Sequence, residues 1–195
     1  GKVRARQLTG GVAVQHAAGR DWRLDAHGFW QVHPAAASTL AAVVGEWAEA
    51  PAGGSAWDLY AGVGLFASVL ASQVGPAGRV LAVESGRRAV ADGEKNLADL
   101  PQVSWRAGRV EHLLAEAAKP VDVVVLDPPR KGAGRAVVES IVAGSPDRIV
   151  YVACDPAALA RDVAFFASHG YSLTDLRAFD AFPMTHHVEC VALLS

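Results

Sequence analysis

The feature that most constrains the fold is an alternation of short apolar runs with helical patterns, which fills the chain from residue 56 to about residue 169. The runs predicted as strands are 57–60, 80–84, 103–106, 121–127 and 149–152, and the helical patterns are 65 onward, 87–100, 110–118, 136–143 and 156–169. Right-handed crossovers turn such repeated β/α units into a parallel sheet with helices on both faces. The chain is therefore predicted to be an α/β protein.

The end of the chain breaks this alternation. Residues 171–179 and 187–194 form two further predicted strands, and the loop between them, which contains Phe182 and Pro183, is too short for a helical crossover. We expect this last pair to be antiparallel. The pattern as a whole predicts a seven-stranded, mostly parallel sheet with a terminal antiparallel strand pair, which is the Rossmann-like layout of class I methyltransferases.

The chain divides into a lead-in segment and a main domain. Residues 1–33 combine short apolar runs with glycine turn signals and predict a few short strands or a hairpin. Pro34 opens an Ala-rich helical pattern that runs to about residue 50, so residues 34–195 are expected to form the catalytic domain. The first residue is Gly1 and not Met, so we expect a fragment or a processed chain with further domains outside it.

Composition narrows the class of protein. The formal net charge of −2 gives no general signal for nucleic-acid binding, and the basic cluster at 130–135 is either a phosphate contact or solvated surface. No run reaches the roughly 20 apolar residues of a membrane span, and no leader peptide is visible. Cys154 and Cys190 lack CxxC spacing, which fits a reducing compartment, so we expect a cytoplasmic location and no metal site. Strand alternation puts His186 and His187 on opposite faces, which also argues against a metal.

A glycine turn follows the first strand of the main domain. Gly62 and Gly64 allow the backbone to turn tightly and to approach a ligand at the edge of the sheet. Glu84 ends the next strand, where a carboxylate accepts hydrogen bonds from ribose hydroxyls. NAD and S-adenosylmethionine both carry such a ribose, so this pattern leaves both cofactors open.

The stretch from Asp127 through two prolines to Arg130 separates these cofactors. Two prolines make a rigid loop that lacks backbone donors, with a carboxylate before it and a guanidinium after it. Dehydrogenases have no need of this loop. Methyltransferases that act on amino groups carry a related Pro-Pro element against a flipped base, so the loop favours transfer to a nucleobase over a plain rigid turn.

Cys154 ends a predicted buried strand and has two interpretations. Asp155 reads as a helix N-cap and Pro156 as the first helical residue, so a helix should begin beside the sulfur. The positive end of that helix favours thiolate and makes Cys154 a candidate nucleophile at neutral pH. In the other interpretation, Cys154 is a small apolar residue packed at a strand end.

Glu189 is a carboxylate within the largely apolar last strand, and two interpretations are again open. The side chain is either a solvated charge at the margin of the sheet or a buried group whose pKa is raised, which would suit a general base.

With these residues assembled, the chain resembles the RNA 5-methyluridine methyltransferases, which modify uridine in transfer and ribosomal RNA. The resemblance extends from about residue 28 to the end and includes, in the family's order, GFWQVHP, DLYAGVGLF, VESG, DPPRKGAG, YVACDPAALARD and FDAFPMTHHVECVALL. One departure is His33, where the family often has Asn. The RNA-binding barrel that usually precedes this domain in the family is expected to be absent from the chain.

The resemblance implies a role for each motif. Cys154 would be the nucleophile that adds to C6 of the uracil ring, and Glu189 the base that removes the C5 proton. The cofactor would be S-adenosyl-L-methionine, and the partner an RNA substrate, with neither a membrane nor a protein partner implied. The implied contacts with the cofactor are Gln31, Tyr60, Glu84 and Asp127, in addition to the turn at Gly62 and Gly64, and those with the target uridine are Asp127 and Arg130.

Independent chemistry favours the same reaction. Uracil C5 is a weak nucleophile, so its methylation needs a thiolate at C6 and then a positioned base. Two alternatives remain: a class I methyltransferase that acts on an exocyclic amine and needs no thiol, and a non-catalytic RNA-binding module on the same fold.

Overall fold

A computed structural model describes residues 11–114, 120–181 and 188–195. The strands are β1 (Val12–Ala17), β2 (Arg20–Asp25), β3 (Ser55–Leu59), β4 (Arg79–Glu84), β5 (Val103–Ala107), β6 (Val123–Leu126), β7 (Arg148–Ala153), β8 (Leu173–Phe179) and β9 (Glu189–Leu194). The helices are α1 (Ala36–Ala48), α2 (Leu65–Val74), α3 (Arg87–Asn96), α4 (Val110–Leu113), α5 (Arg135–Val142) and α6 (Pro156–Ala167).

Seven strands form one sheet in the order β5-β4-β3-β6-β7-β9-β8. β3 to β7 are parallel to one another, whereas β9 runs antiparallel to both β7 and β8. The predicted class I methyltransferase layout and its antiparallel last pair are therefore confirmed. The insertion of β9, the last strand in the sequence, between β7 and β8 was not part of the prediction.

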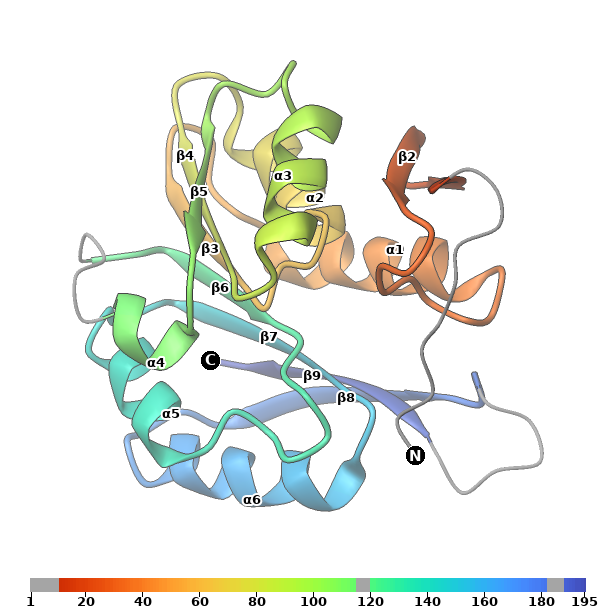
Figure 1. The fold of residues 1–195 in the computed structure, drawn as a ribbon. Helices are drawn as coiled ribbons and strands as arrows, with labels where there is room; N and C mark the ends of the chain where they lie inside the picture. Colours follow the sequence, from red (N-terminus) through yellow and green to blue (C-terminus); the bar gives the residue numbers. More distant parts are fainter. Residues whose placement is uncertain (1–10, 115–119, 182–187) are drawn as a thin grey trace.

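Helices cover both faces of this sheet (Figure 1). Successive side chains of a strand point to opposite faces, so the buried residues of β7 divide between two apolar clusters. Val150 and Val152 pack in the cluster that includes α1 and α2, whereas Ile149 and Tyr151 pack in the cluster that includes α5 and α6. The continuous apolar runs in the sequence thus reflect strands that are buried on both sides.

The lead-in segment contains a β-hairpin, as predicted, made of β1 and β2. Trp22 of this hairpin is fully buried, and its indole N–H donates to the carbonyl of Ala17 at 3.0 Å. The hairpin docks on α3, where the side chain of Asn96 accepts from the Arg23 N–H at 3.0 Å and donates to the Arg23 carbonyl at 2.9 Å. The boundary between lead-in and catalytic domain stays a prediction.

The helices depart from the predicted ranges mainly at their ends. α3 ends at Asn96 and not at about residue 100, because a turn precedes Pro101, whose ring disfavours helical geometry in the residue before it. The predicted helix at 110–118 is seen as α4, and residues 115–118 lie outside the described part, as do Phe182 and Pro183. None of the described helices combines the length and the apolarity needed to cross a membrane.

Candidate active site

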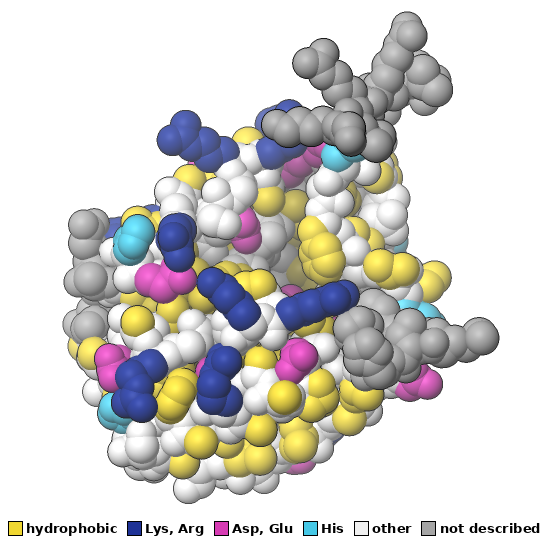
Figure 2. Space-filling model, turned by 60° about the horizontal axis from the view of Figure 1, so that its bottom comes forward, with side chains coloured by type: hydrophobic (Ala, Val, Ile, Leu, Met, Phe, Trp, Pro, Cys, Tyr) yellow, Lys and Arg dark blue, Asp and Glu magenta, His cyan; other side chains and the backbone are white. Residues whose placement is uncertain are grey.

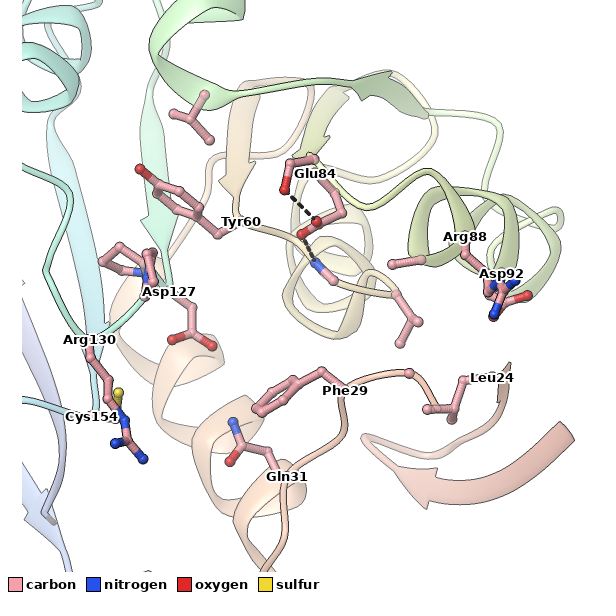
Figure 3. Close-up of a pocket in the computed structure, with 18 of the residues that line it drawn as sticks. Leu24, Phe29, Gln31, Tyr60, Glu84, Arg88, Asp92, Asp127, Arg130 and Cys154 are labelled. Carbon is pink, nitrogen blue, oxygen red and sulfur yellow. Dashed lines mark hydrogen bonds between the residues drawn. The ribbon is translucent and has the colours of Figure 1, made fainter. Parts of the chain in front are cut away.

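A cavity of about 800 Å³ lies at the carboxyl ends of the parallel strands. Open α/β sheets bind ligands at this edge, because the loops that follow the strands diverge there. The lining includes every predicted site residue except Gly64: Gln31, Tyr60, Gly62, Glu84, Asp127, Arg130, Cys154 and Glu189. Figure 3 shows many of these side chains directed toward a common space.

The antiparallel pairing of β7 and β9 brings Cys154 and Glu189 together. Ala153 pairs with Cys190 and Val152 with Val191, so the next position in the register sets Cys154 opposite Glu189. Residues opposite one another in adjacent strands point to the same face, with Cβ atoms about 5 Å apart. A thiol and a carboxyl that are 35 positions apart in the sequence thus meet at one wall of the cavity.

The helix after Cys154 begins as predicted. The carboxylate of Asp155 accepts a hydrogen bond from the Ala158 N–H at 2.8 Å, and Pro156 is the first helical residue. This cap fixes the direction in which the chain leaves β7, so it also fixes the half-buried sulfur.

The surroundings of Cys154 oppose the thiolate that this helix end was expected to favour. Burial raises the pKa of the Cys154 thiol, and the negative charges of Glu189 and Asp127 raise it further. The positive charge of Arg130 acts in the opposite direction but does not outweigh them. The protonated thiol is therefore the dominant form at neutral pH.

Glu189 is a buried carboxyl group and not a solvated charge. It is only 3% exposed, and burial raises its pKa. Asp127 lies close by, and its pKa is also raised by burial and by the carboxyls of Glu189 and Asp58. Crowded, desolvated carboxyls of this kind are typical of groups that accept and release protons near neutral pH.

Glu84 is held in place by the glycine turn. One carboxylate oxygen accepts from the Gly62 N–H at 3.0 Å (Figure 3), and the other accepts from the Gly86 N–H at 2.6 Å. Gly62 has φ of +56°, and no heavy atom lies within 4 Å of the place where its Cβ would be. The backbone therefore presents an open surface to the cavity beside a fixed carboxylate.

Gly64 does not line the cavity. It is the buried N-cap of α2 with φ of +92°, and a Cβ there would lie 2.8 Å from the Leu97 side chain and 2.9 Å from the Trp105 ring. Gly64 therefore allows the turn and the close packing of α2. It can affect a bound ligand only by setting the conformation of the backbone.

Tyr60 reaches the cavity from an unusual backbone conformation. Its φ of +63° lies in the left-handed region, which is uncommon for a residue with a side chain and often marks a functional site. Burial raises the pKa of its phenol, so the group stays a neutral hydrogen-bond donor.

The cavity also has walls that the sequence patterns did not indicate. Asp25 of the hairpin and Asp92 of α3 line one end, where the Asp25 N–H donates to the Asp92 carboxylate at 2.9 Å. Phe29, 74% exposed, and the α4 residue Glu111 complete other parts of the lining. Their positions depend on contacts between distant segments, which leave no local signal in the sequence.

His33 lies outside this cavity and lines a smaller neighbouring one. Its Nδ1 accepts from the Ala35 N–H at 3.2 Å, a local turn just before α1. Among the described residues, no group of three or more His, Cys, Asp or Glu side chains is arranged to hold a metal ion. His186 and His187 are outside that part of the chain.

Comparison with known proteins agrees with this geometry. Residues 113–195 match the family model described as tRNA (Uracil-5-)-methyltransferase. A Streptomyces avermitilis protein named as an uncharacterized RNA methyltransferase is 49% identical over 98% of this chain and 46% of its own length. A Streptomyces coelicolor protein of the same description is 51% identical over 98% of this chain and 44% of its own length.

A solved structure extends the comparison to three dimensions. The Pyrococcus abyssi tRNA (uracil-54, C5)-methyltransferase in complex with S-adenosyl-L-homocysteine superposes with a TM-score of 0.82 at 28% identity. The match covers 98% of this chain and 46% of that one. The chain therefore spans about half the length of the relatives that it matches, and the resemblance expected from its motifs is confirmed.

Proposed function

We propose that this chain, which resembles the RNA 5-methyluridine methyltransferases in its family-model match and in its fold, carries out S-adenosylmethionine-dependent methylation of C5 of a uridine in tRNA or rRNA. The observation that carries this proposal is the pairing of Cys154 with Glu189 at the wall of a cavity. The reaction needs a nucleophile and a base on the same side of one ring, and this pair supplies both.

The cavity fits the cofactor on structural grounds. Its volume of about 800 Å³ is within the range of sites for nucleotide-sized ligands. Glu84 would accept from the ribose hydroxyls, and the open backbone at Gly62 would allow close approach. Gln31, Tyr60 and Asp127 are proposed as the remaining contacts. S-adenosylmethionine, when bound, supplies a methyl group made electrophilic by its sulfonium charge.

Cys154 begins the chemistry. After the thiol has lost its proton, the sulfur forms a bond to C6, and the electron pair of the C5–C6 double bond moves toward the O4 carbonyl to give an enolate. C5 of this enolate then takes the methyl group, and S-adenosyl-L-homocysteine would leave with the electron pair of the broken sulfur–methyl bond. Arg130, which lowers the pKa of Cys154, contributes positive charge beside the reacting groups and favours both the thiolate and the enolate.

Glu189 completes the reaction. Its carboxylate removes the proton from C5, the electron pair of that C–H bond restores the double bond, and the sulfur leaves C6 as thiolate. The raised pKa of Glu189 suits this role, because a carboxyl with a pKa above its ordinary value is a stronger base. Asp127, from the same cavity wall, would contact the uracil ring together with Arg130.

The partner is proposed to be RNA. Four basic side chains line the cavity and supply positive charge there, although the chain has a net charge of −2: Arg88, Arg109, Arg130 and Lys131. Figure 2 shows Lys and Arg side chains spread over one face with hydrophobic side chains exposed between them, a mixture that suits phosphates and bases together. The matched relatives are about twice as long, so we expect this chain alone to bind RNA weakly and with strong salt dependence.

The test uses RNA that lacks the modification and isotopically labelled S-adenosylmethionine. We expect label in 5-methyluridine with the unaltered protein, none with Cys154→Ala, and normal amounts with Cys190→Ala, the matched control for the other buried cysteine. RNA that contains 5-fluorouridine should trap a protein–RNA adduct, because fluorine cannot leave C5 as a proton does. Label in another nucleoside, or label that survives Cys154→Ala, would refute the proposal in favour of transfer to an amine.

A further inference from the structure

Asp162 is a fully buried carboxylate on α6 that the reaction above does not use. One of its oxygens accepts from the Ala133 N–H at 2.7 Å, from the Gly134 N–H at 3.2 Å and from the Tyr151 hydroxyl at 2.7 Å. The other accepts from the side chain of Arg161 at 3.0 and 2.8 Å. Asp155 already caps α6, so the hydrogen bonds to Asp162 are not needed to begin that helix.

These contacts join two segments that are separate in the sequence. The residues that donate backbone N–H groups belong to the loop between β6 and α5, which continues directly from Asp127 and Arg130. Arg161 adds a further contact by donating to the carbonyl of Lys131 at 2.7 Å. Asp162, in turn, lies on the helix that begins right after Cys154.

The loop has the backbone that this arrangement requires. Gly132 has φ of +77°, and a Cβ there would lie 2.5 Å from both the Arg161 guanidinium and the Asp162 carboxylate. Only glycine fits between the loop and the two side chains. Tyr151 is also fully buried, and burial with the neighbouring carboxylate raises the pKa of its phenol, so it remains a donor.

We propose that Asp162, Arg161 and Tyr151, here called the Asp162 clamp, are positioning residues that hold Arg130 beside Cys154. The clamp holds the loop that carries Arg130 against the helix that follows Cys154, so the guanidinium and the sulfur keep a fixed relation. Arg130 lowers the pKa of the thiol, and a loosened loop would withdraw that charge. The catalytic consequence rests on the proposed function, but the geometric claim does not.

The test measures the reactivity of Cys154 without any methyl transfer. The rate of alkylation of Cys154 by iodoacetamide is followed against pH by mass spectrometry in the unaltered protein, Asp162→Asn, Tyr151→Phe and the control Asp175→Asn, whose side chain is exposed on β8. We expect the midpoint of the pH profile to shift upward by about half a pH unit or more in Asp162→Asn, and in the same direction but less in Tyr151→Phe. The control should not change.

Hydrogen exchange and adduct formation supply the second readout. The N–H groups of Ala133 and Gly134 should exchange at least about tenfold faster in Asp162→Asn, since the amide offers one uncharged acceptor oxygen to donors that now share two charged ones. Adduct formation with 5-fluorouridine RNA should slow by roughly 10- to 100-fold. If Asp162→Asn does not fold, Tyr151→Phe, which keeps the shape of the ring, carries the test alone.

The outcomes separate the two proposals. An unchanged alkylation profile in folded Asp162→Asn, or in Tyr151→Phe if that variant alone folds, would overturn the clamp, whatever the protein does to RNA. Failure of the unaltered protein to form the RNA adduct would overturn the proposed function, whereas shifted alkylation profiles in the variants would still support the clamp.

Discussion

At the scale of single residues, Cys154 and Glu189 work against each other in the resting protein. The carboxyl that is proposed to remove the C5 proton also raises the pKa of the thiol that must first ionise. The arrangement lowers the fraction of Cys154 that is thiolate at neutral pH, and in the proposed mechanism it supplies a strong base after methyl transfer. Rates that depend on thiolate should therefore increase with pH through the neutral range.

Replacing Glu189 should separate these two effects. In Glu189→Gln the charge opposite the sulfur is gone, so we expect the midpoint of Cys154 alkylation to move to lower pH, while methylation falls by about 100-fold or more. Iodoacetamide labelling and a methylation assay measure both. The control is Glu94→Gln, an exposed position on α3, and an alkylation midpoint unchanged from the unaltered protein would contradict the pairing.

Asp58 is a second residue whose charge conflicts with its surroundings. It is fully buried, one oxygen accepts from the Ala67 N–H at 2.7 Å, and the other has no partner among the described residues. Burial raises its pKa from 3.8 to about 8, so the folded protein holds a proton there that the unfolded chain has lost. The stability contributed by this proton is full below about pH 4 and is lost as pH rises toward 8.

Asp58→Asn should remove this pH dependence, because an amide resembles the neutral acid. We expect the variant to have a larger free energy of unfolding than the unaltered protein at pH 8, on the order of a few kcal/mol, and little difference at pH 4. Urea unfolding at both pH values measures this. Asp122→Asn is the opposite control, since Ser55 donates to its carboxylate and lowers its pKa, so that variant should lose stability at pH 8.

At the scale of secondary-structure elements, α3 sits unusually close to β5. Gly93 faces the ring of Trp105, and a Cβ there would lie 2.3 Å from the nearest ring atom. Gly64, at the start of α2, meets the same ring and the side chain of Leu97. Because neither glycine has a side chain, α2 and α3 can pack against the Trp105 indole of β5 more closely than a larger residue would allow.

Gly93→Ala should therefore destabilise the protein despite the better helix propensity of Ala. We expect a loss of about 1–3 kcal/mol in the free energy of unfolding, which is the usual cost of overpacking. Urea unfolding measures the loss, with Glu94→Ala as the exposed control on the same helix. In the double variant Gly93→Ala/Trp105→Phe, the smaller phenyl ring should recover part of the lost free energy of unfolding. Equal losses in Gly93→Ala and in the double variant would argue against the clash.

At the scale of the whole molecule, the hairpin closes one end of the cavity. Leu24, Asp25 and Gly28 line that end, and hydrogen bonds to Asn96 and Asp92 attach the hairpin to α3. The segment ahead of the main sheet thus contributes to the proposed cofactor site. Trp22 and Leu24 anchor the hairpin in the apolar core, and its polar contacts with α3 are separate from that anchor, so they can be weakened on their own.

Asn96→Ala should loosen this wall. The variant loses both hydrogen bonds to Arg23, each worth about 1 kcal/mol, and we expect the Kd for S-adenosylmethionine to rise by about 3- to 10-fold. Calorimetric titration measures the Kd, and Lys95→Ala, an exposed neighbour on α3, is the control. A Kd equal to that of the control would mean that the hairpin does not contribute to the site.

Much of the architecture could be predicted because its signals are local. Apolar runs buried on two faces, the Asp155 cap with Pro156, and the glycine turn each act within a few residues. The short connection before β9 also determines an antiparallel pair. These local patterns were enough to indicate a class I methyltransferase layout and a cavity at the carboxyl ends of its strands.

Tertiary structure alone decided which groups meet and how they titrate. The insertion of β9 between β7 and β8 sets Glu189 opposite Cys154, and burial of the sulfur together with the charge of that carboxyl raises the thiol pKa that the helix end was expected to lower. The docking of the hairpin on α3 joins residues 73 positions apart, and the clamp joins Ala133 and Asp162, which are 29 positions apart. Strand order, register and burial arise from the packing of the whole chain, and desolvation and charge act through that space, so no local pattern in the sequence encodes them.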